Sequence, residues 1–140
     1  MTRARPALAG AGAALVWAAL EPIDKRVFRN DYSDVALLGK FVTRSRAWPL
    51  AGLGVHALNG ALFGLAFDVA RRRTSTPPRR LALTLALAEH VSLFPLSAVV
   101  DRKHPARGEP GVRNVFSLPG FAQATARHAL FGVVLGRYGA

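Results

Sequence analysis

Long apolar runs alternate with short, strongly basic segments along this chain. The apolar runs cover about residues 6–23, 48–70, 81–100 and 119–138. A helix rises 1.5 Å per residue, so about 20 residues cross a hydrocarbon layer of roughly 30 Å. The pattern predicts an all-α fold, a four-helix transmembrane bundle that forms a single integral membrane domain over residues 1–140.

The first apolar run allows two interpretations. Its uninterrupted part, residues 7–20, is short for a membrane span, and Arg3 and Arg5 precede it as in a secretory signal peptide. Glu21 and Pro22 follow it without the small-residue pattern of a cleavage site. We therefore favour a membrane span, with cleavage as a signal peptide as the alternative.

The connection between the first two runs, residues 21–47, contains a shorter apolar pattern. Ser33 precedes it and is a residue type that caps helices, and Trp48 follows it. Apolar side chains recur between them at helical spacing: Val35, Leu38, Phe41 and Val42. We interpret this segment as a short helix lying in the membrane interface. A loop helix packed on the bundle is the alternative.

The distribution of charged residues indicates what the chain binds and how it is oriented. The chain has 19 Lys and Arg against 8 Asp and Glu, but they fall between the apolar runs instead of along folded faces. This segregation favours the lipid bilayer as partner and argues against nucleic acid. The segment 71–80 holds five Arg and no acid, which favours a cytoplasmic position for it and for both termini by the positive-inside rule. The segment 21–47 holds six basic residues, so the opposite orientation stays open.

Composition narrows the chemistry further. The chain has no cysteine, which excludes disulfides, thiol catalysis and iron–sulfur clusters. Its richness in Ala, Arg, Gly and Leu with few Lys is typical of a GC-rich bacterial genome. We expect a multi-pass protein of the bacterial cytoplasmic (inner) membrane.

One nine-residue pattern occurs twice. Residues 56–64 read H-A-L-N-G-A-L-F-G, and residues 128–136 read H-A-L-F-G-V-V-L-G. A step of four residues stays on one helix face, and glycines on such a face allow close helix packing. The packing candidates are Gly52, Gly60, Gly64, Gly132 and Gly136. The repetition predicts two repeated helix pairs, although chance identity in an alanine-rich chain is the alternative.

Polar side chains interrupt three of the apolar runs near their middle: His56, Asn59, Glu89, His90 and His128. An ionisable group at the centre of a bilayer is costly and commonly marks a functional site. Because histidine titrates near neutral pH, we expect a buried cluster that binds protons, in a pH-responsive or proton-coupled protein. The alternative is a set of interhelical hydrogen bonds that only fix packing.

Other functions have less support in the sequence. We expect no cofactor, although a metal ion held by His56, His90 and His128, or a haem, is an alternative. Glu89-His90 as acid and base would suit a lipid-modifying enzyme, but no nucleophile with its base is visible, so we favour a protein that is not an enzyme. Catalytic residues are not predicted.

A non-catalytic scaffold is the second functional hypothesis. In it the Gly-x-x-x-Gly faces pair the chain with itself, as a homo-oligomer, or with another membrane protein. The remaining acids, such as Glu21, Asp24 and Asp101, are interpreted as structural ion pairs, and His104 as an exposed loop residue.

Four short motifs resemble the YagU-type family of small bacterial inner-membrane proteins. The first is W17-A-A-L-E-P-I-D-K-R26, followed by His56, by H90-V-S-L-F-P-L96 and by Arg127-His128. The resemblance covers all four apolar runs, but the connections here are shorter and far more basic. It implies a four-span, self-associating inner-membrane protein linked to acid tolerance, and it carries over no active site.

Overall fold

The computed structural model describes residues 4–140 and is all-helical over that range. Its elements in chain order are α1 (Ala4–Phe28), α2 (Asp34–Val42), α3 (Trp48–Arg71), α4 (Pro78–Leu93), the 3₁₀ turn η1 (Phe94–Leu96), α5 (Ser97–Lys103) and α6 (Leu118–Tyr138). Arg3, part of the signal-peptide interpretation, lies outside the described residues.

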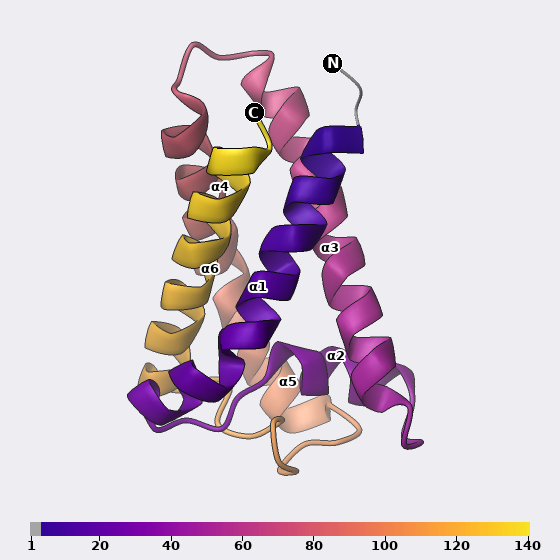
Figure 1. Cartoon of the computed structure of the whole chain (residues 1–140). Coiled ribbons are helices and arrows are strands. Elements are labelled where there is room, and N and C mark those ends of the chain that lie inside the picture. Colours follow the sequence, from indigo (N-terminus) through magenta and orange to yellow (C-terminus); the bar gives the residue numbers. More distant parts are fainter. Residues whose placement is uncertain (1–3) are drawn as a thin grey trace.

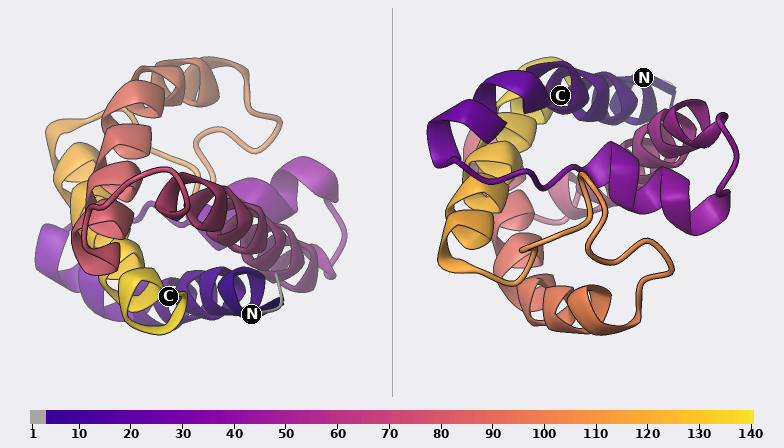
Figure 2. Two further views of the ribbon diagram at one scale, coloured as in Figure 1. Left: turned by 90° about the horizontal axis from the view of Figure 1, so that it is seen from above. Right: turned by 90° about the horizontal axis from the view of Figure 1, so that it is seen from below.

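The long helices α1, α3, α4 and α6 run alongside one another (Figure 1). Both termini and the α3–α4 connection lie at one end, and α2, α5 and the segment 104–117 cover the other end (Figure 2). Helix α1 packs on α3 and α6, and α4 packs on α6, whereas α3 and α4 touch each other little. The long helices therefore enclose a central space with one weakly closed side.

Three of the four predicted spans coincide with helical segments long and apolar enough to cross a membrane. These are α1, α3 and the segment Pro78–Lys103, which runs from α4 through η1 to α5. Among the described residues α6 does not meet the same criterion, because it carries Gln123, Arg127 and His128 within its 21 residues. The chain is thus membrane-protein-like in three helices, and α6 differs by polar side chains that point inward.

The side-chain pattern is inverted relative to a water-soluble bundle. The main core is made largely of alanines and aromatic residues, including Ala13, Ala86 and Phe67. Large aliphatic side chains face outward instead, with Leu58 and Val91 about as exposed as surface residues. A water-soluble protein rarely exposes so much contiguous apolar surface, so this arrangement suits a lipid environment.

Glycines set the distance between α1 and α3. A Cβ atom on Gly10 would overlap the carbonyl oxygen of Gly60, and one on Gly64 would overlap that of Pro6. Only glycine lets the two backbones come this close. At the start of α3, Gly52 makes the same kind of approach to the carbonyl of Val35 in α2.

The second copy of the pattern packs in a similar way. A Cβ atom on Gly132 would lie 2.7 Å from the Cα of Leu83, and one on Gly136 would lie 2.7 Å from that of Arg79. Each copy of the motif thus brings its helix onto the long helix that precedes it, α3 onto α1 and α6 onto α4. This similarity agrees with a repeat of helix pairs, which stays a prediction.

The short helix expected after residue 33 is present as α2. The Ser33 hydroxyl accepts a hydrogen bond from the backbone N–H of Ala36, 3.0 Å away, as the capping prediction required. Helix α2 packs on the start of α3, where Gly39 approaches the carbonyl of Trp48. Phe41 at its other face remains largely exposed.

Two boundaries differ from the sequence expectation. Helix α1 continues through Pro22 to Phe28, which carries Asp24 onto α6. The third span is interrupted by η1, where Pro95 stands at the first turn. A proline without a backbone N–H ends the regular hydrogen-bond ladder at such a point.

The segment 104–117 is pinned to the start of α2. Tyr32 pairs with Gly111 in an isolated bridge, and Ser33 N–H donates to the Gly111 carbonyl at 2.9 Å. His104, expected to be exposed, is buried, because one ring nitrogen bonds the Leu37 carbonyl and the other accepts from Ala106 N–H. A proline after a histidine signals a loop but does not reveal what the loop folds against.

Candidate functional site

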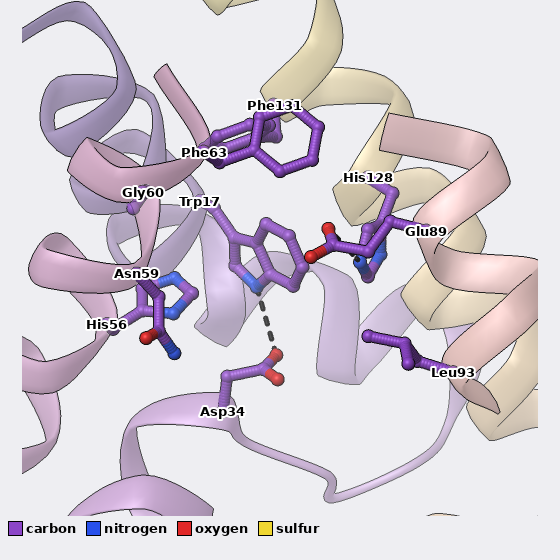
Figure 3. A pocket seen from close by; sticks show the side chains of 11 residues that line it. Trp17, Asp34, His56, Asn59, Gly60, Phe63, Glu89, Leu93, His128 and Phe131 are labelled. Atoms are coloured by element: carbon purple, nitrogen blue, oxygen red, sulfur yellow. Dashed lines mark hydrogen bonds and ion pairs between the residues drawn. The ribbon is translucent and has the colours of Figure 1, made fainter. Parts of the chain in front are cut away.

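A pocket of about 250 Å³ lies between the four long helices, with α2 at its floor (Figure 3). Every one of these five helices contributes to its wall. The lining residues are Ala14, Trp17, Asp34, His56, Asn59, Gly60, Phe63, Glu89, Leu93, His128 and Phe131. Four of the five polar candidates, His56, Asn59, Glu89 and His128, are therefore brought together.

The indole of Trp17 stands between the two histidines of the repeated motif (Figure 3). Its ring centroid is 5.1 Å from that of His56 and 4.7 Å from that of His128, both in T-shaped contacts. The indole N–H donates to a carboxylate oxygen of Asp34 at 3.1 Å. One aromatic side chain thus links both motif copies to an acid at the pocket floor.

His56 has an unsatisfied ring nitrogen. The side chain lies on the α1-facing stripe of α3, between Gly52 and Gly60, and is 7% exposed. Its Nε2 is buried and has no hydrogen-bond partner among residues 4–140. A buried polar atom without a partner is costly, so this nitrogen is a natural point for a proton or a ligand to bind.

His128 lies beside Glu89, on the side of the pocket away from His56 (Figure 3). Its Nδ1 is 2.8 Å from the Ala124 carbonyl one turn earlier, which orients the ring. Its Nε2 lies 3.9 Å from a Glu89 carboxylate oxygen, an ion-pair distance when the imidazole is protonated. The two side chains therefore form an ion pair only when His128 carries a proton.

His90 contacts one other candidate, His128, but from outside the central pocket. Its Nε2 is 2.9 Å from the Thr125 hydroxyl, and its ring stacks at a tilt on His128 with centroids 4.8 Å apart. It is buried between α4 and α6 and does not line the central pocket. Adjacent residues on a helix point about 100° apart, so Glu89 and His90 cannot both face one site.

The geometry gives the metal alternative no support. Over residues 4–140 no group of three or more His, Cys, Asp or Glu side chains has the arrangement to hold a metal ion. His56 and His128 are separated by the Trp17 ring, which occupies the position an ion between them would take (Figure 3).

An ion cluster centred on Arg127 closes the floor beneath the pocket. The guanidinium is almost fully buried and forms a bidentate pair with Asp24, at 2.6 and 2.7 Å. A third nitrogen donates to Asp34 at 2.7 Å, and the Tyr32 ring covers the guanidinium face. This cluster joins α1, α2 and α6 at one point.

Further buried polar groups complete the cluster. Glu21 accepts from the Ser33 hydroxyl at 2.5 Å and from the Asp34 backbone N–H at 2.9 Å. Gln123, which is fully buried, donates to Asp24 at 2.6 Å and accepts from Asn30 at 3.1 Å. Glu21 and Asp24, interpreted from the sequence as structural ion pairs, are buried partners of Arg127, whereas Asp101 accepts from the backbone N–H groups of Val115 and Phe116.

Asp34 stands at the boundary between the ion cluster and the pocket. Burial alone would raise the pKa of its carboxyl, but the Arg127 guanidinium and other nearby groups outweigh burial and hold the pKa below its usual range. Asp34 therefore carries a negative charge at neutral pH. That charge lies under Trp17 and the two motif histidines.

Sequence reasoning missed this cluster although one signal was present. Arg127 lies inside the fourth predicted span, and an arginine in such a position needs an acidic partner as much as Glu89 needs a basic one. The partner acids stand at the end of the first span and in the following connection. Their pairing needs the fold, because about 100 residues separate Asp24 from Arg127.

No protein family model, curated protein or solved structure matches this chain. The resemblance to the YagU-type family, which was based on short motifs, stays a prediction.

Proposed function

We propose that this chain is a four-span inner-membrane protein whose central pocket binds and releases protons as the pH changes. The observation that carries the proposal is the contact of His56 and His128 with one Trp17 ring above the charged Asp34. Two titratable imidazoles around a shared aromatic ring form a coupled unit, because a proton on one changes the electrostatic environment of the other.

Opposing influences act on a proton at His56. Burial and the Arg127 charge disfavour the protonated imidazole, whereas the Asp34 carboxylate favours it. At His128 the nearest acid is Glu89, with a carboxylate oxygen 3.9 Å from Nε2. A proton in the pocket therefore lies near two acids, Asp34 beneath the Trp17 ring and Glu89 beside His128. An indole face adds attraction for a cation.

The arrangement of the basic residues supports the proposed orientation. The α3–α4 connection, with its arginines between residues 71 and 80, lies at the same end as both termini (Figure 1). In a four-span topology all three would face the cytoplasm, as the positive-inside rule favours. The Arg127 cluster and the floor of the pocket would then lie toward the outer side of the membrane.

The glycine faces that the scaffold hypothesis would use pack within the chain. The glycines at 60, 64, 132 and 136 are each in contact with a helix of the same chain. They offer no free Gly-x-x-x-Gly face for a second copy. Self-association stays a prediction and would need another surface, so we give the proton-binding proposal precedence.

The proposal predicts that the fluorescence of Trp17 changes with pH. The chain has two tryptophans, so Trp48→Phe leaves Trp17 as the sole reporter. Between pH 5 and 8 we expect a reversible change with the two-step shape of coupled histidines, because a protonated imidazole quenches an indole in contact with it. His56→Gln and His128→Gln should each remove one step, as followed in the purified protein in detergent.

His104→Gln is the matched control, because His104 contacts Leu37 and Phe41 and not Trp17. Its titration curve should match that of the parent. A curve that is flat between pH 5 and 8, or one unchanged by both pocket substitutions, would overturn the proposal. Histidine resonances in NMR spectra of the same samples would assign each step.

A further inference from the structure

A groove runs between α3 and α4 next to the central pocket. It has a volume of about 350 Å³ and is lined on one side by Ala66, Phe67 and Ala70 and on the other by Leu85, Ala88 and Ser92. Both helices belong to candidate membrane spans, and they touch each other little. Ala88 and Ser92 are exposed, so the groove opens on the outer surface of the molecule, where the bilayer would be.

Two residues are shared by the groove and the pocket. Phe63 and Glu89 line both, so the two spaces are neighbours with a carboxylate at their junction. The side chain of Glu89 is 41% exposed and accepts no hydrogen bond within residues 4–140. Its nearest basic group, Nε2 of His128, is beyond hydrogen-bond distance at 3.9 Å. A carboxylate in this position lacks a strong partner.

Acidic groups predominate around the pocket, whereas the chain as a whole is strongly basic. The chain carries a formal +11, but the cluster at the pocket floor sets Glu21, Asp24 and Asp34 against the single guanidinium of Arg127. Glu89 adds a further acid on the opposite wall. Binding of a positively charged ligand is therefore favoured, and a negatively charged ligand is repelled.

The other side chains that line the pocket also favour a cationic ligand. Trp17, Phe63 and Phe131 present aromatic rings to the pocket, and such rings attract cations through their faces. The buried, unpartnered Nε2 of His56 supplies one more hydrogen-bonding group on the side opposite Glu89. Aromatic walls, an unpaired acid and a lateral apolar groove together define a site for an amphiphilic cation.

We propose that this groove and pocket bind a lipophilic cation, with its charged centre at Glu89 and its apolar body between α3 and α4. This inference rests on the proposed function, because the cation would enter a pocket that also takes up protons. The groups that face Glu89 are His128 from α6, His56 from α3 and Asp34 from α2, and α1 contributes the uncharged Trp17. A proton on Glu89 or His128 would compete with the cation.

The test uses two probes of the same shape and opposite charge, tetraphenylphosphonium and tetraphenylborate. Their binding to the purified Trp48→Phe protein is measured at pH 8 and pH 5.5 by Trp17 quenching and by equilibrium dialysis. We expect saturable binding of tetraphenylphosphonium, at least tenfold weaker at the lower pH, and no saturable binding of tetraphenylborate. Equal binding of both probes would overturn the inference.

Three variants locate the site. Glu89→Gln should weaken binding at least tenfold, and Glu89→Asp should retain part of it. Ala88→Phe, at an exposed position in the groove, should block binding although the carboxylate remains. Glu109→Gln is the matched control, because Glu109 pairs with Arg44 and Lys40 in the segment that covers the far end. Tetraphenylphosphonium binding unchanged in Glu89→Gln would overturn the inference, and circular dichroism verifies the folding of each variant.

The two proposals fail separately. If tetraphenylphosphonium does not bind but the histidine-dependent pH curve of Trp17 is present without it, only the lipophilic-cation inference is wrong. If the pH curve is flat but binding depends on Glu89, the proton-binding function of the histidines is wrong and the cation site stands.

Discussion

Arg127→Met is expected to cause the largest loss of stability of any single substitution in this chain. Methionine fills a similar volume but leaves Asp24 and Asp34 buried without the guanidinium that they share. Removing one partner of a buried ion pair costs about 3–5 kcal/mol, a large part of the roughly 5–15 kcal/mol by which domains are stable. The melting temperature in one detergent, measured by circular dichroism, checks this expectation.

Arg127→Met should also reverse the way in which the contribution of Asp34 to stability depends on pH. In the parent protein the pKa of Asp34 is held below its usual range, so its contribution to stability is complete above the unfolded-state pKa and is lost as the pH falls through the folded-state value. Without Arg127, burial is the largest remaining influence on this carboxyl, and burial acts to raise its pKa. The difference in stability between the two proteins should therefore shrink as the pH is lowered toward 4.

Two controls separate the ion cluster from a general effect of lost charge. Arg137→Met removes an exposed arginine from the same helix and should leave the melting temperature nearly unchanged. Adding Asp24→Asn and Asp34→Asn to Arg127→Met should restore part of the loss, since Glu21 is then the one acid of the cluster left without the guanidinium. Equal melting temperatures for Arg127→Met and Arg137→Met would contradict the role given to the cluster.

Gly10→Ala is expected to have the second-largest effect, although it adds only one methyl group. The new Cβ would overlap the carbonyl oxygen of Gly60, which is backbone and cannot rotate away. The two helices would have to separate, and overpacking of this kind costs about 1–3 kcal/mol or more. Since α1 and α3 both line the pocket, the contact of Trp17 with His56 should weaken as well, which the pH dependence of Trp17 fluorescence would report.

Gly12→Ala provides the matched control, because a Cβ on Gly12 meets nothing within 4 Å. Alanine favours a helix over glycine by about 1 kcal/mol, so Gly12→Ala should leave the melting temperature unchanged or raise it. A similar effect of both alanines on stability would show that close packing of α1 on α3 does not hold the helices together. Their oligomeric state in detergent should be the same, because both glycines act within one chain.

Much of the fold followed from short-range patterns. The apolar runs predicted α1, α3 and the α4 segment, and the Ser33 signal predicted the capped start of α2, because helix length and capping depend on neighbouring residues. The extension of α1 through Pro22 and the interruption of the third span by η1 were not predicted. Each depends on what the helix ends pack against.

The sequence predicted which residues belong to the candidate site better than it predicted how they are arranged. The sequence singled out His56, Glu89 and His128 because they stand in apolar runs, and all three line one pocket. It also included His90, which does not line this pocket and whose ring is hydrogen-bonded to Thr125. A sequence shows that two residues are adjacent but not how a helix is rotated, and that rotation decided which side chain faces the pocket.

The sequence by itself determined the parts of this protein that depend on local order: long apolar helices, a repeated His-x-x-x-Gly-x-x-x-Gly pattern and a few polar residues within it. Only the tertiary structure decided that Trp17 stands between the two histidines, that Arg127 is buried among Asp24, Asp34 and Glu21, and that α3 and α4 leave a groove between them. The reason is that these contacts join residues far apart in the chain. Their geometry is set by how closely the glycine faces allow the helices to approach, a property of pairs of helices that no single segment contains.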